Sequence, residues 1–505
     1  MKMSRMVCHP GWKQYLLWFA QEHVEFRREE IRSLLSMFNI KMHFVTKPID
    51  VEPFWIVEFP NEDDARRLTS RSVSLRSCIE LYSHSKSILD LHKDLKSYPV
   101  EVMAPYLGEE TSFKIDVETF CRHFSQKEKV DKLEAFEYLP FKGPVRLKNP
   151  DVTFSYIEFY GTDPKCPPEE PYDVFFGRLI ANGLRNLIQT LSLKKRKFIG
   201  NTSMDPQLSL LMANQAKVQD GDLILDPFVG TGSLLVAAAQ FGGHVMGTDI
   251  DFLMLHARTR PSRITQKERE KDESVKSNMQ QYNLESKYID VMVNDCAMVF
   301  WRQGTVFDAI ITDPPYGIRE ATERIGTLKE NYTIEERHLK SHIPAKIEYG
   351  ISKLFKDLLH FSAKHLKMHG RLVCWFPVFR EDYNEDGLPK HPCLELVANS
   401  EQILNTHTSR RLLTYEKLVE FNEDVHLVTN SIDEDEVNNI QDFRTKYYET
   451  REETRKERRM KQAELRMHGK LQQEQRLQRE NASFETGEEK ISCNSVVNDE
   501  NNENK

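Results

Sequence analysis

The sequence lacks the paired cysteines of a disulfide-rich or zinc-binding protein. Its 505 residues include eight cysteines, and no two of these form a C-x-x-C pair. The spacing therefore indicates neither a disulfide framework nor a structural zinc site, and we predict no bound metal. Scattered, unpaired cysteines fit a reducing compartment, so the expected location is the cytoplasm.

Long apolar runs are missing as well. A membrane-spanning helix needs about 18 or more consecutive apolar residues, and no such stretch occurs. The apolar segment 15–20 is too short, and its flanks are too polar, for a signal peptide.

The formal net charge of -8 gives no excess of positive charge for nucleic-acid binding. Local basic patches, however, matter more for such binding than the net charge of the whole chain. A chain of this length is too long for one core and predicts two or three domains.

The clearest motif is DPPYG at residues 313–317, which follows the apolar run 307–312. That run predicts a buried parallel strand, so the motif lies at a strand's carboxyl end, where open α/β sheets bind ligands. Asp313 can accept a hydrogen bond from an amine, and the rigid prolines hold the carbonyl of Pro314 outward as a second acceptor. The ring of Tyr316 offers a face on which a base can stack. Two acceptors around one planar nitrogen suit amine methylation, but a Pro-Pro turn with a solvated aspartate is the alternative for this stretch alone.

A second motif, DPFVGTGS, occupies residues 226–233 between a predicted strand at 222–225 and a predicted helix at 234–241. A strand, a glycine turn and a helix are typical of a nucleotide-binding βα unit. The single G-x-G disfavours a pyrophosphate and favours a cationic cofactor without phosphate, S-adenosylmethionine. Asp226 can pair with the ammonium group of this cofactor, and the glycines let the backbone approach it closely. The predicted cofactor contacts in this motif are Asp226, Phe228, Gly230, Thr231 and Gly232.

Acidic residues end the next two predicted strands as well. The strand 244–248 is followed by Asp249, where α/β folds hold a ribose diol, with Asp251 as the alternative. The strand 288–293 is followed by Asp295, which is placed to accept from the adenine amine. Because parallel strands end at the same edge of a sheet, Asp226, Asp249, Asp295 and Asp313 should line one cleft.

Further elements complete the predicted catalytic domain at residues 191–430. A helix is expected at 351–366, a fifth strand at 371–376, and an antiparallel pair at 394–398 and 411–415. Arg319 follows the DPPYG motif and could orient the substrate or bind a phosphate. The remaining residues, 431–505, are strongly polar and predict a charged helix followed by a disordered tail.

The N-terminal part divides into a small α/β, ferredoxin-like unit at 1–65 and a second unit at 66–163. A Pro-rich linker and a helix, expected at 172–187, occupy 164–190. The run LKNPDV at 147–152 resembles the end of a THUMP domain, an RNA-binding module of several tRNA-modifying enzymes. With this resemblance Arg146 and Lys148 become candidate phosphate contacts, against the alternative of an ordinary solvated turn.

A basic run at 193–198, predicted as strand-like, contains three further RNA candidates. These are Lys195, Arg196 and Lys197, and a solvated basic face is the alternative.

Together, DPFVGTGS and DPPYG resemble the amino-directed class of S-adenosylmethionine-dependent methyltransferases. Read with RKFIGNTSMDPQLSLLMAN, GTDID, TDPPYGIRE and LKNPDV, they make the chain similar to the catalytic subunits of the tRNA guanine-10 N2-methyltransferases over about residues 10–430. The resemblance implies a Rossmann-like class I methyltransferase with a seven-stranded, mostly parallel α/β sheet, preceded by an α+β ferredoxin-like and THUMP region.

This resemblance also implies tRNA as the substrate and an obligate partner, a small zinc-binding activator. We expect the activator to add to the edge strand Tyr288–Val293, because an unpaired apolar edge is a liability unless it is covered. The implied reaction transfers a methyl group from S-adenosylmethionine to the N2 amine of a guanosine at position 10 of tRNA. Asp313, Pro314 and Tyr316 would be its catalytic residues.

Three alternatives stay open. The same chemistry could act on another RNA guanine or adenine amine. The second alternative is a protein glutamine methyltransferase, although such an enzyme normally has asparagine in place of Asp313. A non-catalytic RNA-binding scaffold would have no reason to retain cofactor binding, which calorimetry would test.

Overall fold

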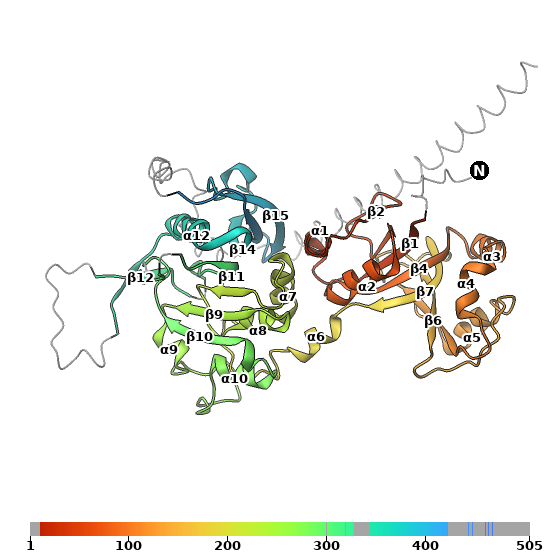
Figure 1. The fold of residues 1–505 in the computed structure, drawn as a ribbon, viewed down its shortest axis with the longest axis horizontal. Helices are drawn as coiled ribbons and strands as arrows, with labels where there is room; N and C mark the ends of the chain where they lie inside the picture. The colour runs from red at the N-terminus through yellow and green to blue at the C-terminus, as the bar shows by residue number, and fades with distance from the viewer. Residues whose placement is uncertain are drawn as a thin grey trace, which may run out of the picture. The chain divides into compact units, whose positions relative to one another are not determined.

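The structure is a computed structural model (Figure 1). It describes residues 11–298, 300–302, 304–318, 320–327 and 343–422, and the single residues Phe443, Tyr447, Met460, Ala463 and Met467. The chain divides into two compact units, Met1–Tyr447 and Tyr448–Lys505. Both large sheets belong to the first unit. No described helix is long and apolar enough to cross a membrane.

The first seven-stranded sheet has the strand order β2-β3-β1-β4-β7-β6-β5. Central β4 pairs with β1 on one side and with β7 on the other, so the predicted boundary at residue 65 falls within one continuous sheet. Its strands are β1 (Lys13–Phe19), β2 (His43–Phe44), β3 (Phe54–Phe59), β4 (Leu75–Ser85), β5 (Phe113–Phe120), β6 (Val152–Phe159) and β7 (Asp173–Asn182). Its helices of nine or more residues are α1 (Arg27–Phe38), α2 (Glu62–Arg71), α3 (Ile88–Lys96) and α5 (Gln126–Glu134).

The helix expected at 172–187 is wrong, because most of this segment is β7, antiparallel to both β4 and β6. Phe175 and Phe176 are both buried but belong to different core clusters, one on each face of the sheet. A strand covered on both faces has a continuous apolar run in place of alternation, and such a run cannot be told from a buried helix by its period. Helix forms only afterwards, in the short α6 (Arg185–Thr190).

The strand-like run expected at 193–198 does not form a strand either. Side chains of α10 (Val275–Gln281) pair with its backbone instead. The amide of Lys197 donates to Gln281 Oε1 at 2.8 Å, and that of Phe198 donates to Asn278 Oδ1 at 2.8 Å. Because these backbone groups already have partners, the segment does not need a neighbouring strand.

The second seven-stranded sheet has the order β10-β9-β8-β11-β14-β16-β15. Neighbouring strands from β10 to β14 are parallel, and β16 is antiparallel to both β14 and β15. This confirms the predicted mostly parallel sheet with a final antiparallel pair, and it places β10 at an edge. The strands are β8 (Leu223–Asp226), β9 (His244–Asp249), β10 (Tyr288–Val293), β11 (Phe307–Thr312), β14 (Leu366–Phe379), β15 (Leu394–Ile403) and β16 (Thr408–Lys417).

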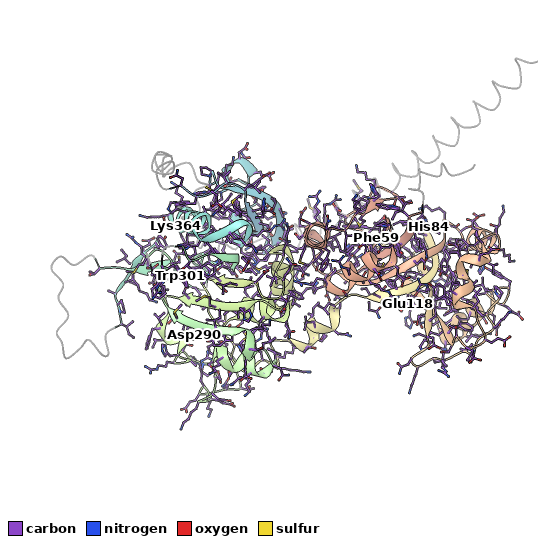
Figure 2. All side chains as sticks on the ribbon, viewed as in Figure 1. Phe59, His84, Glu118, Asp290, Trp301 and Lys364 are labelled. Carbon is purple, nitrogen blue, oxygen red and sulfur yellow. The ribbon has the colours of Figure 1, made fainter. Side chains whose placement is uncertain are left out.

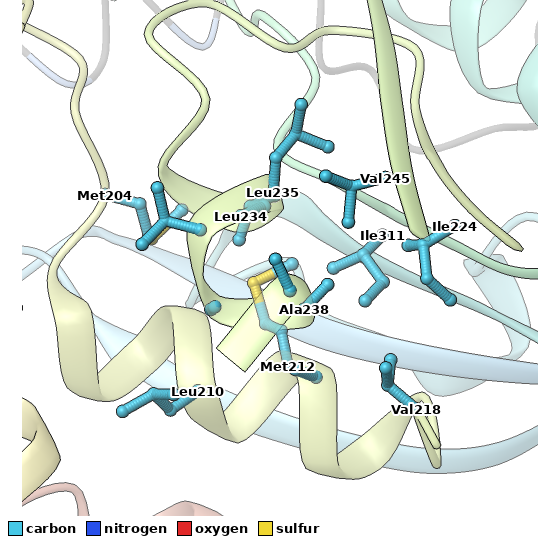
Figure 3. Close-up of a cluster of buried hydrophobic side chains, with 14 of the residues drawn as sticks. Met204, Leu210, Met212, Val218, Ile224, Leu234, Leu235, Ala238, Val245 and Ile311 are labelled. Atoms are coloured by element: carbon cyan, nitrogen blue, oxygen red, sulfur yellow. The ribbon is translucent and has the colours of Figure 1, made fainter. Parts of the chain in front are cut away.

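Two hydrophobic cores cover the two faces of this sheet. One contains α7 (Pro206–Gln215) and α8 (Ser233–Gln240), and Figure 3 shows Met212, Ala238 and Ile311 meeting within it. The other contains the apolar side of α12 (Ile351–His365). Successive residues of β11 enter opposite cores, as a pleated strand requires. These layers leave the carboxyl ends of the parallel strands to form the site.

Hydrogen bonds also join the N-terminal helices to the domain of the second sheet. Glu30 of α1 is fully buried and accepts from Asn214 Nδ2 of α7 at 2.7 Å. Arg71 of α2 donates from Nε to Asn214 Oδ1 at 2.7 Å, and its guanidinium lies 3.4 Å from the ring centre of Phe241. We call Glu30, Arg71 and Asn214 the junction.

Candidate active site

A cavity of about 580 Å³ lies at the carboxyl ends of the parallel strands. Its wall brings together most of the residues that the sequence predicts for the site. Those that line it are Asp226, Phe228, Gly230, Thr231, Asp249, Asp295, Asp313, Pro314 and Tyr316. Of the predicted catalytic and cofactor residues, Gly232 is not among the lining residues, and the predicted substrate residue Arg319 lies outside the described residues.

The glycine turn after β8 has a conformation that its sequence explains. Gly230 and Gly232 have φ values of +48° and +76°, in the left-handed region that favours glycine. A Cβ on Gly232 would lie 2.6 Å from Val275 Cγ1, so this glycine lets α10 pack against the turn. The amide of Gly230 donates to Asp249 Oδ2 at 2.8 Å and ties the turn to the end of β9.

Asp226 is buried at the base of the cavity, with 2% of its surface exposed. Its Oδ1 accepts from the Thr312 hydroxyl at 2.7 Å and from the amide of Phe228 at 3.0 Å. Burial raises the pKa of Asp226 to about 7; the negative charges of Asp249 and Asp313 add to this rise, and the two hydrogen bonds oppose it. A bound cation would offset this cost and favour the ionised carboxylate.

Asp249 and Asp295 are held by backbone amides. Asp249 Oδ1 accepts from the amide of Asp251 at 2.9 Å, while Asp295 accepts from Ala297 and Ile325 at 2.9 and 2.6 Å. Burial raises the pKa of Asp249. A carboxylate oxygen has two lone pairs, so each side chain can still accept from a ligand. Asp251, the alternative to Asp249, also lines the cavity, and its side chain caps α9 (Phe252–Leu255).

Asp313 has one paired and one unpaired carboxylate oxygen. Its Oδ2 accepts from Arg410 Nη1 at 3.1 Å, whereas Oδ1 is buried and has no hydrogen-bond partner among the described residues. Burial raises the pKa of Asp313, and the charge of Arg410 opposes that rise. A buried acceptor without a partner costs about 1–3 kcal/mol, so the site favours a ligand that donates a hydrogen bond there.

Arg410 of β16 was missed in the sequence. Its Nη1 also donates to the Tyr316 hydroxyl at 3.2 Å, and its guanidinium lies 3.9 Å from the ring centre of Trp375. The predicted strand began one residue later, at 411, which left Arg410 in a loop. An arginine inside a buried, apolar strand would have been the signal, because such a charge requires a partner.

Phe443 and Tyr447 are two of the few described residues of the predicted tail, 431–505, most of which lies outside the described residues. Phe443 is fully buried, with its ring centre 6.0 Å from that of Tyr316 and 5.3 Å from that of Phe379. Tyr447 lines the cavity.

The candidate RNA contacts have different surroundings. Arg196 is 1% exposed and donates to Ser233 Oγ at 2.9 Å and to the carbonyl of Leu191 at 3.1 Å, so its predicted RNA contact is wrong. Lys195 is exposed, and Lys197 is exposed but pairs with Asp272 at 3.1 Å. Arg146 and Lys148 are exposed in the loop before β6.

Comparisons with known proteins agree with both halves of this architecture. The family model described as the Tmrp11 THUMP N-terminal domain matches residues 13–185, and that of the RMKL-like methyltransferase domain matches residues 194–342. The tRNA (guanine(10)-N(2))-methyltransferase TRMT11 of Rattus norvegicus is 51% identical over 408 residues, which cover 81% of this chain and 88% of the relative. The chain belongs to the tRNA (guanine(10)-N(2))-methyltransferase family.

The Homo sapiens TRMT11 protein of this family is 50% identical over 411 residues, covering 81% of this chain and 89% of the relative. A solved structure, TrmN from Thermus thermophilus, is 17% identical and covers 80% of this chain and all of that one, with a TM-score of 0.38. Membership of the tRNA (guanine(10)-N(2))-methyltransferase family confirms the predicted combination of a THUMP region and a methyltransferase domain.

Proposed function

We propose that this chain is a catalytic subunit that transfers a methyl group from S-adenosylmethionine to the N2 amine of guanosine 10 in tRNA. The observation that carries the proposal is the unpaired, buried Oδ1 of Asp313, beside Pro314 and Tyr316 in the cavity wall. An exocyclic amine supplies the donor that this oxygen lacks. Membership of the family supports tRNA as the substrate and guanosine as the target.

The residues fit S-adenosylmethionine. Buried Asp226, whose pKa is about 7, would pair with the ammonium group of the cofactor. This positive charge would lower the pKa of Asp226 and favour its ionised form. Asp249 would hold the ribose hydroxyls and Asp295 the adenine amine, with Phe228, Gly230 and Thr231 completing the wall. When bound, this cofactor supplies an electrophilic methyl group.

In the proposed reaction, Asp313 orients the target amine. Its Oδ1 and the carbonyl of Pro314 accept the two N–H groups, which directs the nitrogen lone pair toward the methyl group. The target guanine leaves its stack, as in other enzymes that act on bases, and lies on the ring of Tyr316. Asp313 need not remove a proton first, because a sulfonium methyl group is already a strong electrophile. The bond between sulfur and the methyl carbon would break as the N–C bond forms, and the methylated nitrogen would then release one proton.

The experiment uses the purified chain, with and without the zinc-binding activator, labelled cofactor and unmodified tRNA, followed by digestion to nucleosides. We expect N2-methylguanosine with the wild type and none with Asp313→Ala, while calorimetry still detects cofactor binding. Methyladenosine would retain the chemistry and contradict the substrate. Absence of cofactor binding would favour a non-catalytic RNA-binding scaffold.

A partner at the edge strand β10 is part of the proposal. Ile289 and Val293 of this strand are 49% and 40% exposed. In sequence they lie before and after Asp290, which Figure 2 labels on this edge strand. An exposed apolar edge suits strand addition by the activator. The N-terminal region or the tail covering this edge is the alternative. A cytoplasmic location remains a prediction from the scattered cysteines.

The partner proposal is tested by co-purification of the activator with Ile289→Lys/Val293→Lys. We expect the double substitution to abolish capture, because lysines on an edge strand oppose pairing. Leu89→Lys is the control, since Leu89 is 82% exposed on α3. An intact complex with the double variant would contradict the proposal.

A further inference from the structure

A glutamine in the wall of the same cavity has a fixed orientation. Gln402 of β15 faces Arg410 of β16 in the strand register, and Arg410 Nε donates to Gln402 Oε1 at 2.8 Å. Both side chains line the cavity that contains Asp313. A guanidinium has donors only, so the amide atom that faces it must be the oxygen. The contact therefore settles which end of the Gln402 amide is the nitrogen.

Arg410 itself is committed to neighbouring residues. Its Nη1 donates to Asp313 and Tyr316, and its Nη2 lies 3.8 Å from the sulfur of Met204. Its guanidinium also lies over the ring of Trp375. Arg410 is thus placed to orient its neighbours, and little of its donor capacity is left for a base.

The amide nitrogen of Gln402 is available to donate a hydrogen bond. Its side chain is half-buried, and its Nε2 has no hydrogen-bond partner among the described residues. This nitrogen keeps some exposed surface, because it is not among the fully buried, unpaired side-chain atoms. The cavity wall therefore offers an acceptor at Asp313 Oδ1 and a donor at Gln402 Nε2, both positioned by Arg410.

We propose that Gln402 is a specificity-determining residue that donates a hydrogen bond to O6 of the target guanine. The inference rests on the proposed function and deepens it. Guanine carries its amine N2 and its acceptor O6 on one Watson–Crick edge, the edge by which flipped bases are read. Adenine instead carries an amine at position 6. This amine and the amide nitrogen of Gln402 are both donors, so neither would gain a hydrogen bond from the other.

The test compares tRNAs that carry guanine, 2-aminopurine or 2,6-diaminopurine at the target position. All three have the N2 amine, whereas 2-aminopurine lacks O6 and 2,6-diaminopurine replaces it with an amine. For the wild type we expect kcat/KM about tenfold lower with 2-aminopurine than with guanine, the size of one lost hydrogen bond. With Gln402→Leu, the kcat/KM for guanine should fall to that for 2-aminopurine, so that the ratio of the two kcat/KM values approaches one.

A second variant gives a change in the opposite direction. Gln402→Glu presents an oxygen in place of the amide nitrogen, so 2,6-diaminopurine should become a better substrate than guanine. Gln280→Leu is the matched control, because Gln280 is an exposed glutamine of α10. Its three rates should equal those of the wild type.

Two results would overturn the inference while leaving the proposed function intact. One is equal wild-type rates with guanine and 2-aminopurine, and the other is a wild-type ratio retained by Gln402→Leu. A wild type that binds the cofactor and the activator but never methylates guanine would overturn the proposed function and, with it, this inference.

Discussion

The guanidinium of Arg410 donates to Oδ2 of Asp313 at 3.1 Å, across the antiparallel end of the sheet. The charge of Asp313 in turn adds to the raised pKa of Asp226 at the end of β8 and of Cys374 on β14, and the Tyr316 hydroxyl shares the same guanidinium nitrogen. Burial raises the pKa of Asp313, while Arg410 lowers it. Arg410 therefore favours the ionised form of the Asp313 carboxylate.

Arg410→Met should make methyl transfer more sensitive to acid. Without the cation, the pKa of Asp313 rises further, so the acid limb of the kcat/KM profile should move to higher pH. The measurement is the pH profile with saturating cofactor. Arg410→Lys keeps the charge but not the fork of donors, so it should shift the limb less. Identical profiles for Arg410→Met and the wild type would show that Arg410 does not support the ionisation of Asp313.

Cofactor affinity should depend on the ionisation of Asp226. Its pKa is about 7 without ligand, and a cationic cofactor favours the charged form. The affinity for S-adenosylmethionine should therefore rise with pH, by up to about tenfold per unit below pH 7, and level off above it. Calorimetry at several pH values measures this slope. Asp226→Asn should bind weakly with no such slope, and a wild-type affinity independent of pH would exclude this role for Asp226.

The same raised pKa gives a stability effect of defined sign. Because the pKa of Asp226 is higher in the folded state than its ordinary value of 3.8, its contribution is greatest at low pH and is lost as pH rises toward 7. Without cofactor, Asp226→Asn should thus have a higher Tm than the wild type at about pH 8, and the difference should shrink toward pH 5.

The cofactor side of the site was predictable because it depends on local order. In βαβ repeats the residue after each parallel strand reaches the same edge, so Asp226, Asp249, Asp295 and Asp313 could be placed together without knowing the sheet order. The contacts of Arg410 with Asp313 and with Gln402 could not be predicted in this way. It depends on the register between β14, β16 and β15, which a single sequence does not specify.

The errors at residues 172–187 and at Arg196 have a related cause. β7 is covered on both faces, so its apolar run has no strand period. Arg196 looks like part of a basic surface run, but its neighbours in sequence do not reveal the Ser233 hydroxyl that binds it. In both cases the deciding contacts come from distant parts of the chain.

The junction should be needed for stability. Asn214→Ala removes one hydrogen bond from buried Glu30 and one from half-buried Arg71, both charged groups. Such bonds contribute about 1.5–3 kcal/mol each, so a fall in unfolding free energy of about 3 kcal/mol and a clearly lower Tm are expected. Thermal unfolding measures the effect, with the exposed Gln280→Ala as the control. Equal Tm values for Asn214→Ala and the wild type would show that the junction does not contribute.

The affinity for tRNA should depend on Arg146 and Lys148, because both are exposed candidates for phosphate contacts. Each such contact releases about one counterion, so the plot of log K against log salt should lose about one unit of slope for Arg146→Glu and again for Lys148→Glu. Lys197→Glu should have a smaller effect, because Lys197 already pairs with Asp272.

Filter binding of unmodified tRNA across a salt series measures these slopes, and Lys390→Glu, another exposed charge reversal, is the control. Arg196→Gln should lower Tm and leave the slope unchanged, since that guanidinium is buried against Ser233. A wild-type slope in the Arg146 and Lys148 variants would place the tRNA on another surface of the protein.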